Sequence, residues 1–180
     1  MLCFSFVRGI VIEDSASDRY YMDIALQEAG LAAAAGEIPV GAVVVLNGEL
    51  IARAHNRREE LQSPLAHAEA LAIESAAKRI KSWRLEEALL YVTMEPCIMC
   101  VGAILQARIE RLVFGCWDPK AGAVESLHRL CEDTRLNHRL PWTGGVLEKE
   151  CSAVLTQFFA ELRKKSHPLA SKAEGSGRDN

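Results

Sequence analysis

Apolar residues recur every three or four positions in three long stretches of the chain, and this spacing predicts three helices. Asp18 can cap the first helix through its carboxylate, and Gly36 can end it. Ser63 and Pro64 are typical of residues that open a helix, and basic residues in the last turn favour the end of this second helix. The three predicted helices cover residues 18–35, 66–81 and 147–165.

Shorter apolar runs predict the strands of a sheet. Asn47-Gly48 separates two such runs and suits a type I′ turn, because both central residues of that turn need a positive φ. Two later runs flank a short helix that begins at Pro96 and reaches residue 106, and such a crossover places its two strands parallel. A further short helix is expected near residues 125–131. The predicted strands cover residues 40–46, 50–54, 88–93 and 111–116, with a last short strand within residues 139–146.

Helices that alternate with strands favour an α/β fold, here a three-layer α/β/α sandwich with a central mixed five-stranded sheet. A length of 180 residues suits about one domain. That domain would cover residues 18–165, after a poorly ordered N-terminal extension at residues 1–17. Residues 166–180 are too polar to offset the entropy of ordering, and we expect a disordered tail there.

Composition narrows the class of protein. Hydrophobic residues make up 49% and charged residues 25%, as in an ordinary soluble globular protein. A formal net charge of −3 gives no global attraction to nucleic acid, so such binding would need a local patch. No apolar run approaches the roughly 18 residues of a membrane span. We therefore expect a cytoplasmic protein with no membrane partner. In such a protein, a Cys-x-x-Cys motif indicates metal or redox chemistry rather than a structural disulfide.

Two linked motifs carry the candidate chemistry, His67-x-Glu69 and Pro96-Cys97-x-x-Cys100. One imidazole and two thiolates form the ligand set of a catalytic zinc ion whose fourth position is left for water. His67 falls in the first turn of the predicted second helix, and both cysteines fall in the first turn of the next. The partial positive charge of a helix N-terminus stabilises thiolates there. The sequence therefore predicts one Zn²⁺ per chain, bound by His67, Cys97 and Cys100.

Glu69 is a carboxylate that this zinc site does not need as a ligand, so it can move protons between water and a substrate. His-x-Glu with Pro-Cys-x-x-Cys is a known signature of zinc nucleobase deaminases, which replace a ring amino group by water-derived oxygen. Simpler interpretations stay open. His67 could be a satisfied core histidine, the cysteines could be a redox pair, and a zinc ion could be purely structural with some fourth ligand.

Further segments resemble one family in the same order along residues 18–165, the bacterial-type tRNA-specific adenosine deaminases. The resemblance implies a cytidine-deaminase-like fold, a homodimer, and conversion of adenosine to inosine at the wobble position of a tRNA anticodon stem-loop. The segments that carry it are Glu37-Ile-Pro-Val-Gly-Ala-Val, Ala54-His-Asn-Arg, Ala66-His-Ala-Glu, Leu90-Tyr-Val-Thr-Met-Glu-Pro-Cys-Ile-Met-Cys-Val-Gly-Ala, Arg108-Ile-Glu-Arg-Leu-Val-Phe-Gly, Asn137-His-Arg, Gly145-Val-Leu and Phe158-Phe159.

The resemblance also implies which residues bind substrate. Asn56 would contact the purine, the backbone N–H of Ala68 would touch its reacting edge, and Val40 would belong to an apolar wall at residues 38–40. Asp118 would accept a hydrogen bond from the ribose of a flanking nucleotide. Structural interpretations compete here: Asn56 can cap a turn, residues 38–40 can begin a strand, and Asp118 can start an Asp-Pro turn. The residues around this aspartate that depart from the family pattern are Cys116, Trp117 and Pro119.

RNA binding has a physical argument of its own. Single-stranded loops are bound by aromatic side chains that stack on bases and by cations that contact phosphates. Phe158 and Phe159 precede a basic helix end at residues 163–165, and His138, Arg139 and Lys120 could add to this patch. A basic helix end is also typical of a solvated terminus that compensates the helix dipole.

Three rival functions remain. A free-base or nucleotide deaminase that acts on guanine or cytosine would use the same metal site, since a fold does not fix a substrate. A catalytically silent RNA-binding subunit is disfavoured, because it would be expected to lose Glu69. A redox protein that uses Cys97 and Cys100 is the most distant alternative, and its activity would not respond to chelators.

Overall fold

The computed structural model describes residues 15–166. Residues 1–14 of the expected N-terminal extension and residues 167–180 of the expected tail lie outside this range. The helices of the described part are α1 (Ala16–Ala34), α2 (Arg58–Leu61), α3 (Ala68–Ile80), α4 (Ile98–Ala107) and α5 (Glu148–Ser166), with a 3₁₀ helix at Leu130–Glu132. Its strands are β1 (Gly41–Leu46), β2 (Glu49–His55), β3 (Ala88–Met94), β4 (Arg111–Cys116) and β5 (Trp142–Thr143).

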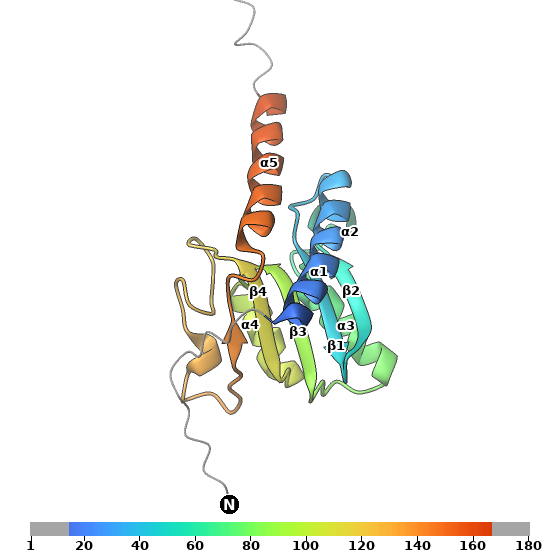
Figure 1. The fold of residues 1–180 in the computed structure, drawn as a ribbon, viewed down its shortest axis with the longest axis vertical. Coiled ribbons are helices and arrows are strands. Elements are labelled where there is room, and N and C mark those ends of the chain that lie inside the picture. Colours follow the sequence, from blue (N-terminus) through green and yellow to red (C-terminus); the bar gives the residue numbers. More distant parts are fainter. Residues whose placement is uncertain (1–14, 167–180) are drawn as a thin grey trace, which may run out of the picture.

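The five strands form one mixed sheet in the order β2-β1-β3-β4-β5 (Figure 1). Strand β1 pairs antiparallel with β2 and β3, whereas β3 pairs parallel with β4 and β4 with β5. The hairpin turn has positive φ at Asn47 and Gly48, as the type I′ prediction requires. The short strand expected within residues 139–146 is β5. The predicted mixed five-stranded sheet is therefore confirmed.

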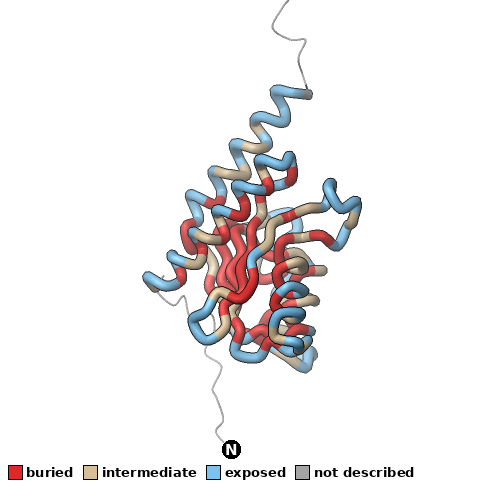
Figure 2. The backbone as a smooth tube through the Cα atoms, turned by 90° about the vertical axis from the view of Figure 1, so that its right-hand side faces the viewer, coloured by how far each residue is buried: buried red, intermediate tan, exposed pale blue. Residues whose placement is uncertain are grey.

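Alternate residues of the strands face two helical layers. Val43 and Val45 of β1 pack in a cluster with Met22 of α1 and Cys151 of α5. Ala42 and Val44 face the other way and belong to a larger cluster with α3 and α4. Figure 2 shows the buried strands between the layers, with exposed residues on the outer faces of the helices. The three-layer α/β/α sandwich is thus confirmed, and a period of two along the strands builds it.

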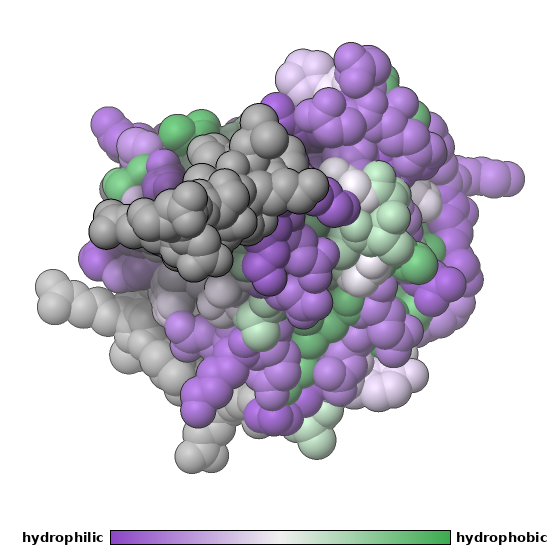
Figure 3. Space-filling model, turned by 90° about the horizontal axis from the view of Figure 1, so that it is seen from above, coloured by the Kyte–Doolittle hydropathy of each residue, from purple (hydrophilic) through white to green (hydrophobic). Residues whose placement is uncertain are grey.

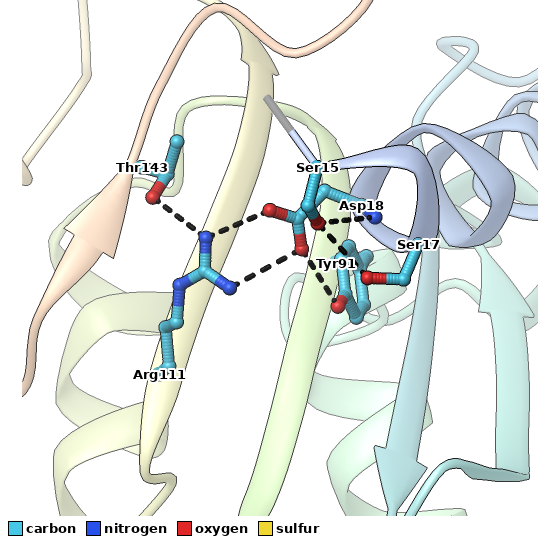
Figure 4. Close-up of polar contacts among 6 residues, drawn as sticks. All are labelled: Ser15, Ser17, Asp18, Tyr91, Arg111 and Thr143. Atoms are coloured by element: carbon cyan, nitrogen blue, oxygen red, sulfur yellow. Dashed lines mark hydrogen bonds and ion pairs between the residues drawn. The ribbon is translucent and has the colours of Figure 1, made fainter. Parts of the chain in front are cut away.

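Helix α1 begins two residues before the predicted start, and the predicted cap is wrong. Ser15 is the N-cap, and its hydroxyl accepts a hydrogen bond from the Asp18 backbone N–H (3.1 Å). The Asp18 side chain instead points across the sheet (Figure 4), where it accepts hydrogen bonds from Tyr91 (3.0 Å) and from Arg111 (2.8 and 3.2 Å). A carboxylate buried in this way needs such partners, and here the hydrogen bond from Tyr91 fastens α1 to β3 while the ion pair with Arg111 fastens it to β4.

Two other predicted helix starts and one predicted helix need correction. Helix α3 begins at Ala68, so His67 is its N-cap residue rather than part of its first turn. Helix α4 begins at Ile98 rather than at the predicted Pro96, so Cys97 is its N-cap residue. The α-helix expected near residues 125–131 does not form, and a 3₁₀ helix at Leu130–Glu132 overlaps the end of that range. Helix α2 was not predicted at all. Within residues 15–166, no helix combines the length and apolarity that a membrane span requires.

Candidate active site and metal centre

The metal-binding side chains meet where two helices begin. His67 and Cys97 have extended backbones as N-caps of α3 and α4, and Cys100 lies in the first turn of α4. The Cys97 Sγ and Cys100 Sγ atoms lie 3.7 Å and 3.5 Å from His67 Nδ1. All three ligand atoms lie within 4.8 Å of one another. Within the described residues, these three side chains form a group that can hold a metal ion.

This spacing fits zinc. A Zn–S bond of about 2.3 Å and a Zn–N bond of about 2.0–2.1 Å at tetrahedral angles place sulfur and nitrogen about 3.5–3.6 Å apart. The two measured sulfur–nitrogen distances, 3.7 Å and 3.5 Å, span that range. The donor set, two thiols and an imidazole, is also one that zinc prefers. The side chains of His67, Cys97 and Cys100 thus fit the zinc ion that the sequence predicts.

A hydrogen bond between the two thiols shifts the pKa of each. This hydrogen bond from Cys100, together with the contact with His67, lowers the pKa of Cys97 to about 3 against the opposing effect of burial. The same hydrogen bond, together with burial, raises the pKa of Cys100. The hydrogen bond to Cys97 in turn raises the pKa of His67. A divalent cation would convert this pair into two thiolates by displacing the shared proton.

Glu69 lies in the first turn of α3 and is 4% exposed. Burial raises the pKa of its carboxyl group, since a charge loses its hydration there. Glu69 is not part of the metal-binding group, although it lies two residues from His67. A buried carboxyl group with a raised pKa beside a metal site is suited to accept and return a proton.

The predicted substrate-binding residues meet in one cavity of about 330 Å³. His67, Cys97 and Glu69 lie in its wall, whereas Cys100 is buried behind them. Its size is at the lower end for a small-molecule site, so it suits one base rather than a larger ligand. The substrate-binding residues predicted from the sequence that line it are Val40, Asn56, Ala68, Asp118 and Phe159. The structure brings these residues together, and their individual roles stay predictions.

Asn56 is fixed in the cavity by a residue that the sequence did not single out. Its side-chain Nδ2 donates a hydrogen bond to Glu37 Oε2 (3.1 Å), and both side chains are buried. The other oxygen of Glu37 accepts from the Glu60 backbone N–H (2.8 Å). Because a carboxylate accepts hydrogen bonds, this contact also decides which way the Asn56 amide faces. Oδ1 and one N–H of Asn56 therefore remain for a ligand.

Asp118 follows β4 and serves two purposes. Its Oδ1 atom accepts hydrogen bonds from the backbone N–H groups of Lys120 (2.9 Å) and Ala121 (3.2 Å), which confirms the turn-starting interpretation. Asp118 also lines the cavity together with Lys120 and Ala121, so its second oxygen can face a ligand. The structural and functional interpretations of this residue are therefore compatible.

Glu95, a second residue to which the sequence assigned no role, lies beside this turn and also lines the cavity. Glu95 is 3% exposed, and hydrogen bonds from Ser126, Glu125 and Asp118 reach its carboxylate. Burial opposes its ionisation, but these hydrogen bonds outweigh burial and lower the pKa of Glu95. Its place just before Pro96-Cys97 was a signal in the sequence, yet its partners lie 23 to 31 positions away.

Comparison with known proteins agrees with this geometry. The family model described as the cytidine and deoxycytidylate deaminase zinc-binding region matches residues 15–116. A tRNA-specific adenosine deaminase of Bacillus subtilis (strain 168) is 53% identical over 148 residues, which span 82% of this chain and 92% of the relative. A tRNA-specific adenosine deaminase of Aquifex aeolicus (strain VF5) is 47% identical over 144 residues, which span 80% and 95%.

A solved structure is also similar. It comes from a study of A-to-I editing by tRNA:A34 deaminases at the wobble position of transfer RNA. It aligns with a TM-score of 0.74 and 45% sequence identity, and the alignment covers 76% of this chain and 99% of that one. From the metal-binding motifs, their geometry and relatives of this similarity, it follows that the chain belongs to the cytidine and deoxycytidylate deaminase family and, within it, to the tRNA-specific adenosine deaminases.

Proposed function

We propose that this protein is a zinc-dependent enzyme that converts adenosine to inosine at the wobble position of a tRNA anticodon. The observation that carries the proposal is the metal-binding group of His67, Cys97 and Cys100, which adjoins the buried Glu69 at a base-sized cavity. The names of the similar proteins point to the same substrate. Hydrolytic deamination consumes one water and releases one ammonia.

The chemistry divides between the metal and Glu69. Bound zinc supplies a Lewis acid that makes water reactive near neutral pH. Glu69 takes a proton from the attacking water as its oxygen adds to C6 of the adenine, and delivers that proton to N1. The second proton of the water passes through the same carboxylate to the amino group, which leaves as ammonia. The buried setting of Glu69 favours this role, because a carboxyl group with a raised pKa gives a proton back easily.

Two groups would hold the base in position. Asn56 presents Oδ1 and one N–H to the purine, and Glu37 keeps that amide from rotating. Ala68 offers a backbone N–H at the start of α3, beside His67 and Glu69. The apolar wall includes Val40, and such a wall favours a flat ring over water. Asp118 at the mouth would accept a hydrogen bond from a neighbouring ribose, and such a 2′-OH contact distinguishes RNA from DNA.

Helix α5 would bind the part of the RNA that lies outside the cavity. Phe159 lines the cavity and is 39% exposed, and its ring lies 5.5 Å from that of Phe158. Residues 163–165 follow one helical turn later, on the part of α5 that extends beyond the sheet in Figure 1. Hydrophilic side chains cover most of the face that contains this helix end, with apolar side chains between them (Figure 3). An aromatic residue beside cations is the arrangement that single-stranded RNA requires.

We expect the replacement of Arg163, Lys164 and Lys165 by Ala to weaken binding of an anticodon stem-loop and to flatten its dependence on salt. Each phosphate contact that is lost should lower the slope of log K against log salt concentration by about 0.7. Binding titrations between low and moderate salt measure this slope. A slope that equals that of the unmodified protein would remove this helix end from the RNA interface.

A matched control exists on another helix. The last turn of α3 and its C-cap also carry three exposed cations, Lys78, Arg79 and Lys81. They lie at the end of α3 opposite to Glu69, a separation of about 14–18 Å at 1.5 Å per residue. Their replacement by Ala changes the net charge equally, so it should leave the salt slope nearly unchanged.

We extend the proposal to the oligomeric state of the protein and to its location in the cell. Exposed apolar side chains flank the metal centre in sequence, with Leu65 62% exposed and Ile98 54% exposed, and the burial of such residues would favour a homodimer. A tRNA substrate would place the enzyme in the cytoplasm.

The test of the function is direct. Purified protein with zinc is incubated with a transcribed anticodon stem-loop, and inosine is detected by mass after digestion. We expect inosine at the wobble position and much less product from free adenosine. Guanine and cytosine serve as the competing substrates, and faster deamination of either one than of the RNA would favour the rival deaminase.

A further inference from the structure

Glu95 is the most heavily hydrogen-bonded side chain near the cavity. Its Oε1 atom accepts from three consecutive backbone N–H groups, those of Val124 (3.1 Å), Glu125 (2.8 Å) and Ser126 (2.9 Å). Its Oε2 atom accepts from the Asp118 backbone N–H (3.0 Å) and from the Ser126 hydroxyl. Successive N–H groups that converge on one oxygen form a concave site for an anion, and here that anion is part of the chain.

The donors all belong to the loop that follows β4. Strands β3 and β4 are parallel and their last residues, Met94 and Cys116, are paired in register. Glu95 therefore leaves β3 at the same edge of the sheet where the loop leaves β4. The loop reaches the cavity through Asp118, Lys120 and Ala121. The carboxylate of Glu95 thus holds the loop at both its beginning and its later part.

The loop also contacts the metal-binding segment itself. The Ala123 backbone N–H donates to the Pro96 carbonyl (2.9 Å), and Cys97 forms an isolated antiparallel bridge with Gly122. A Cβ at Gly122 would collide with the carboxylate of Glu95, and its three nearest atoms would all belong to that group. The absence of a side chain at Gly122 therefore permits the close approach of loop and carboxylate.

We propose that Glu95 is a positioning residue that fastens the loop at residues 118–126 to the metal-binding segment, and so sets the place of Asp118 and Lys120 at the mouth of the cavity. This inference rests on the proposed function for what the loop recognises, an RNA strand beside the target base. The metal ligands and the recognition loop then form one rigid unit. A shift of the loop would change substrate binding while the metal site and Glu69 stay in place.

The first test is Glu95→Gln. The amide keeps the shape of the side chain, but its NH₂ group replaces one of the two oxygens. An NH₂ group donates hydrogen bonds, so it cannot accept those that the loop donates to that oxygen. We expect the backbone amides of residues 118–126 to exchange with deuterium about 10- to 100-fold faster, the range that follows from loss of charge-assisted hydrogen bonds. The zinc content and the exchange of β3 amides should stay unchanged. The RNA concentration for half-maximal rate should rise about tenfold, with a smaller change in the maximal rate.

Two further variants complete this test. Ser126→Ala removes one donor from an exposed residue, so it should fold normally and speed exchange of the same amides to a smaller extent. Glu132→Gln is the matched control, because this carboxylate accepts from the Trp142 indole (3.3 Å) outside the loop. Unchanged loop exchange in both Glu95→Gln and Ser126→Ala would overturn the proposal. Loss of zinc in proportion to activity would overturn it as well, since Glu95 would then support the metal site alone.

A double-mutant cycle tests the contact from the other side. Gly122→Ala should speed loop exchange in the normal protein, because the new methyl group displaces the carboxylate. In a Glu95→Ala background that space is free, and the same substitution should have little further effect. Equal effects in the two backgrounds would contradict the proposal. These exchange measurements need no RNA, so they distinguish a failure of this inference from a failure of the unmodified enzyme to deaminate RNA.

Discussion

Glu69→Ala is expected to retain about one zinc per chain and to lose deamination by a factor of about 10²–10⁴, the usual contribution of a positioned acid–base group. The carboxylate does not belong to the metal-binding group, so the thiolates and imidazole can still hold the ion. Without Glu69, protons must reach N1 and the amino group from bulk water, which the buried wall of the cavity hinders. Metal analysis and single-turnover formation of inosine measure the two quantities on the same sample.

Two controls sharpen this experiment. Glu69→Gln preserves volume and should be almost as inactive, which separates proton transfer from packing. Glu74→Ala removes a carboxylate from the same helix, where Glu74 pairs with Lys78 at the surface (2.5 Å), and should keep full activity. Turnover by Glu69→Ala at the normal rate would refute the assigned role, whatever its zinc content.

The sheet and its helical layers could be predicted because they follow local rules. Alternation along β1 assigns Val43 and Val44 to opposite faces, and Asn47-Gly48 defines the hairpin. The metal ligands were predictable for a related reason. Cys97 and Cys100 are three positions apart, and His67 lies two positions from Glu69, so each pair is recognisable without knowledge of the fold.

The wrong predictions concern residues whose partners are distant in sequence. Asp18 is a good helix cap by residue type, but Arg111 and Tyr91, 93 and 73 positions away, bind its carboxylate, and Ser15 caps the helix instead. Such long-range contacts leave no mark in a local pattern. Glu37 and Glu95 were missed for the same reason, although both are buried beside the cavity.

The helix expected near residues 125–131 is absent for a similar reason. The N–H groups in the first turn of a helix have no partner within it, and here those of Val124, Glu125 and Ser126 donate to Glu95. The amides that follow do not continue as a helix, because Leu127 donates to the Gly122 carbonyl (3.1 Å) and Leu130 to the Ala123 carbonyl (3.2 Å), five and seven positions earlier. Helical spacing does not reveal this turn, since the carboxylate that holds it lies about thirty positions earlier in the chain.

The last prediction concerns the metal itself. Cys100→Ala is expected to lose most of its zinc and its activity, whereas Cys131→Ala should keep both. Both cysteines are 0% exposed, so each change removes one buried sulfur atom, with a packing cost of about 1 kcal/mol. Of the two cysteines, only Cys100 contacts His67, with its Sγ atom 3.5 Å from His67 Nδ1.

Thermal unfolding gives a readout that is independent of turnover. A bound metal stabilises the folded state, so a chelator should lower the unfolding temperature of the normal protein and of Cys131→Ala, and added zinc should restore it. Cys100→Ala should begin at the lower temperature and respond to neither reagent. A chelator that left both activity and unfolding temperature of the normal protein unchanged would exclude the metal centre and favour a dithiol instead. Recovery of both the activity and the unfolding temperature on addition of zinc would exclude the redox interpretation, because thiol–disulfide exchange needs no bound cation.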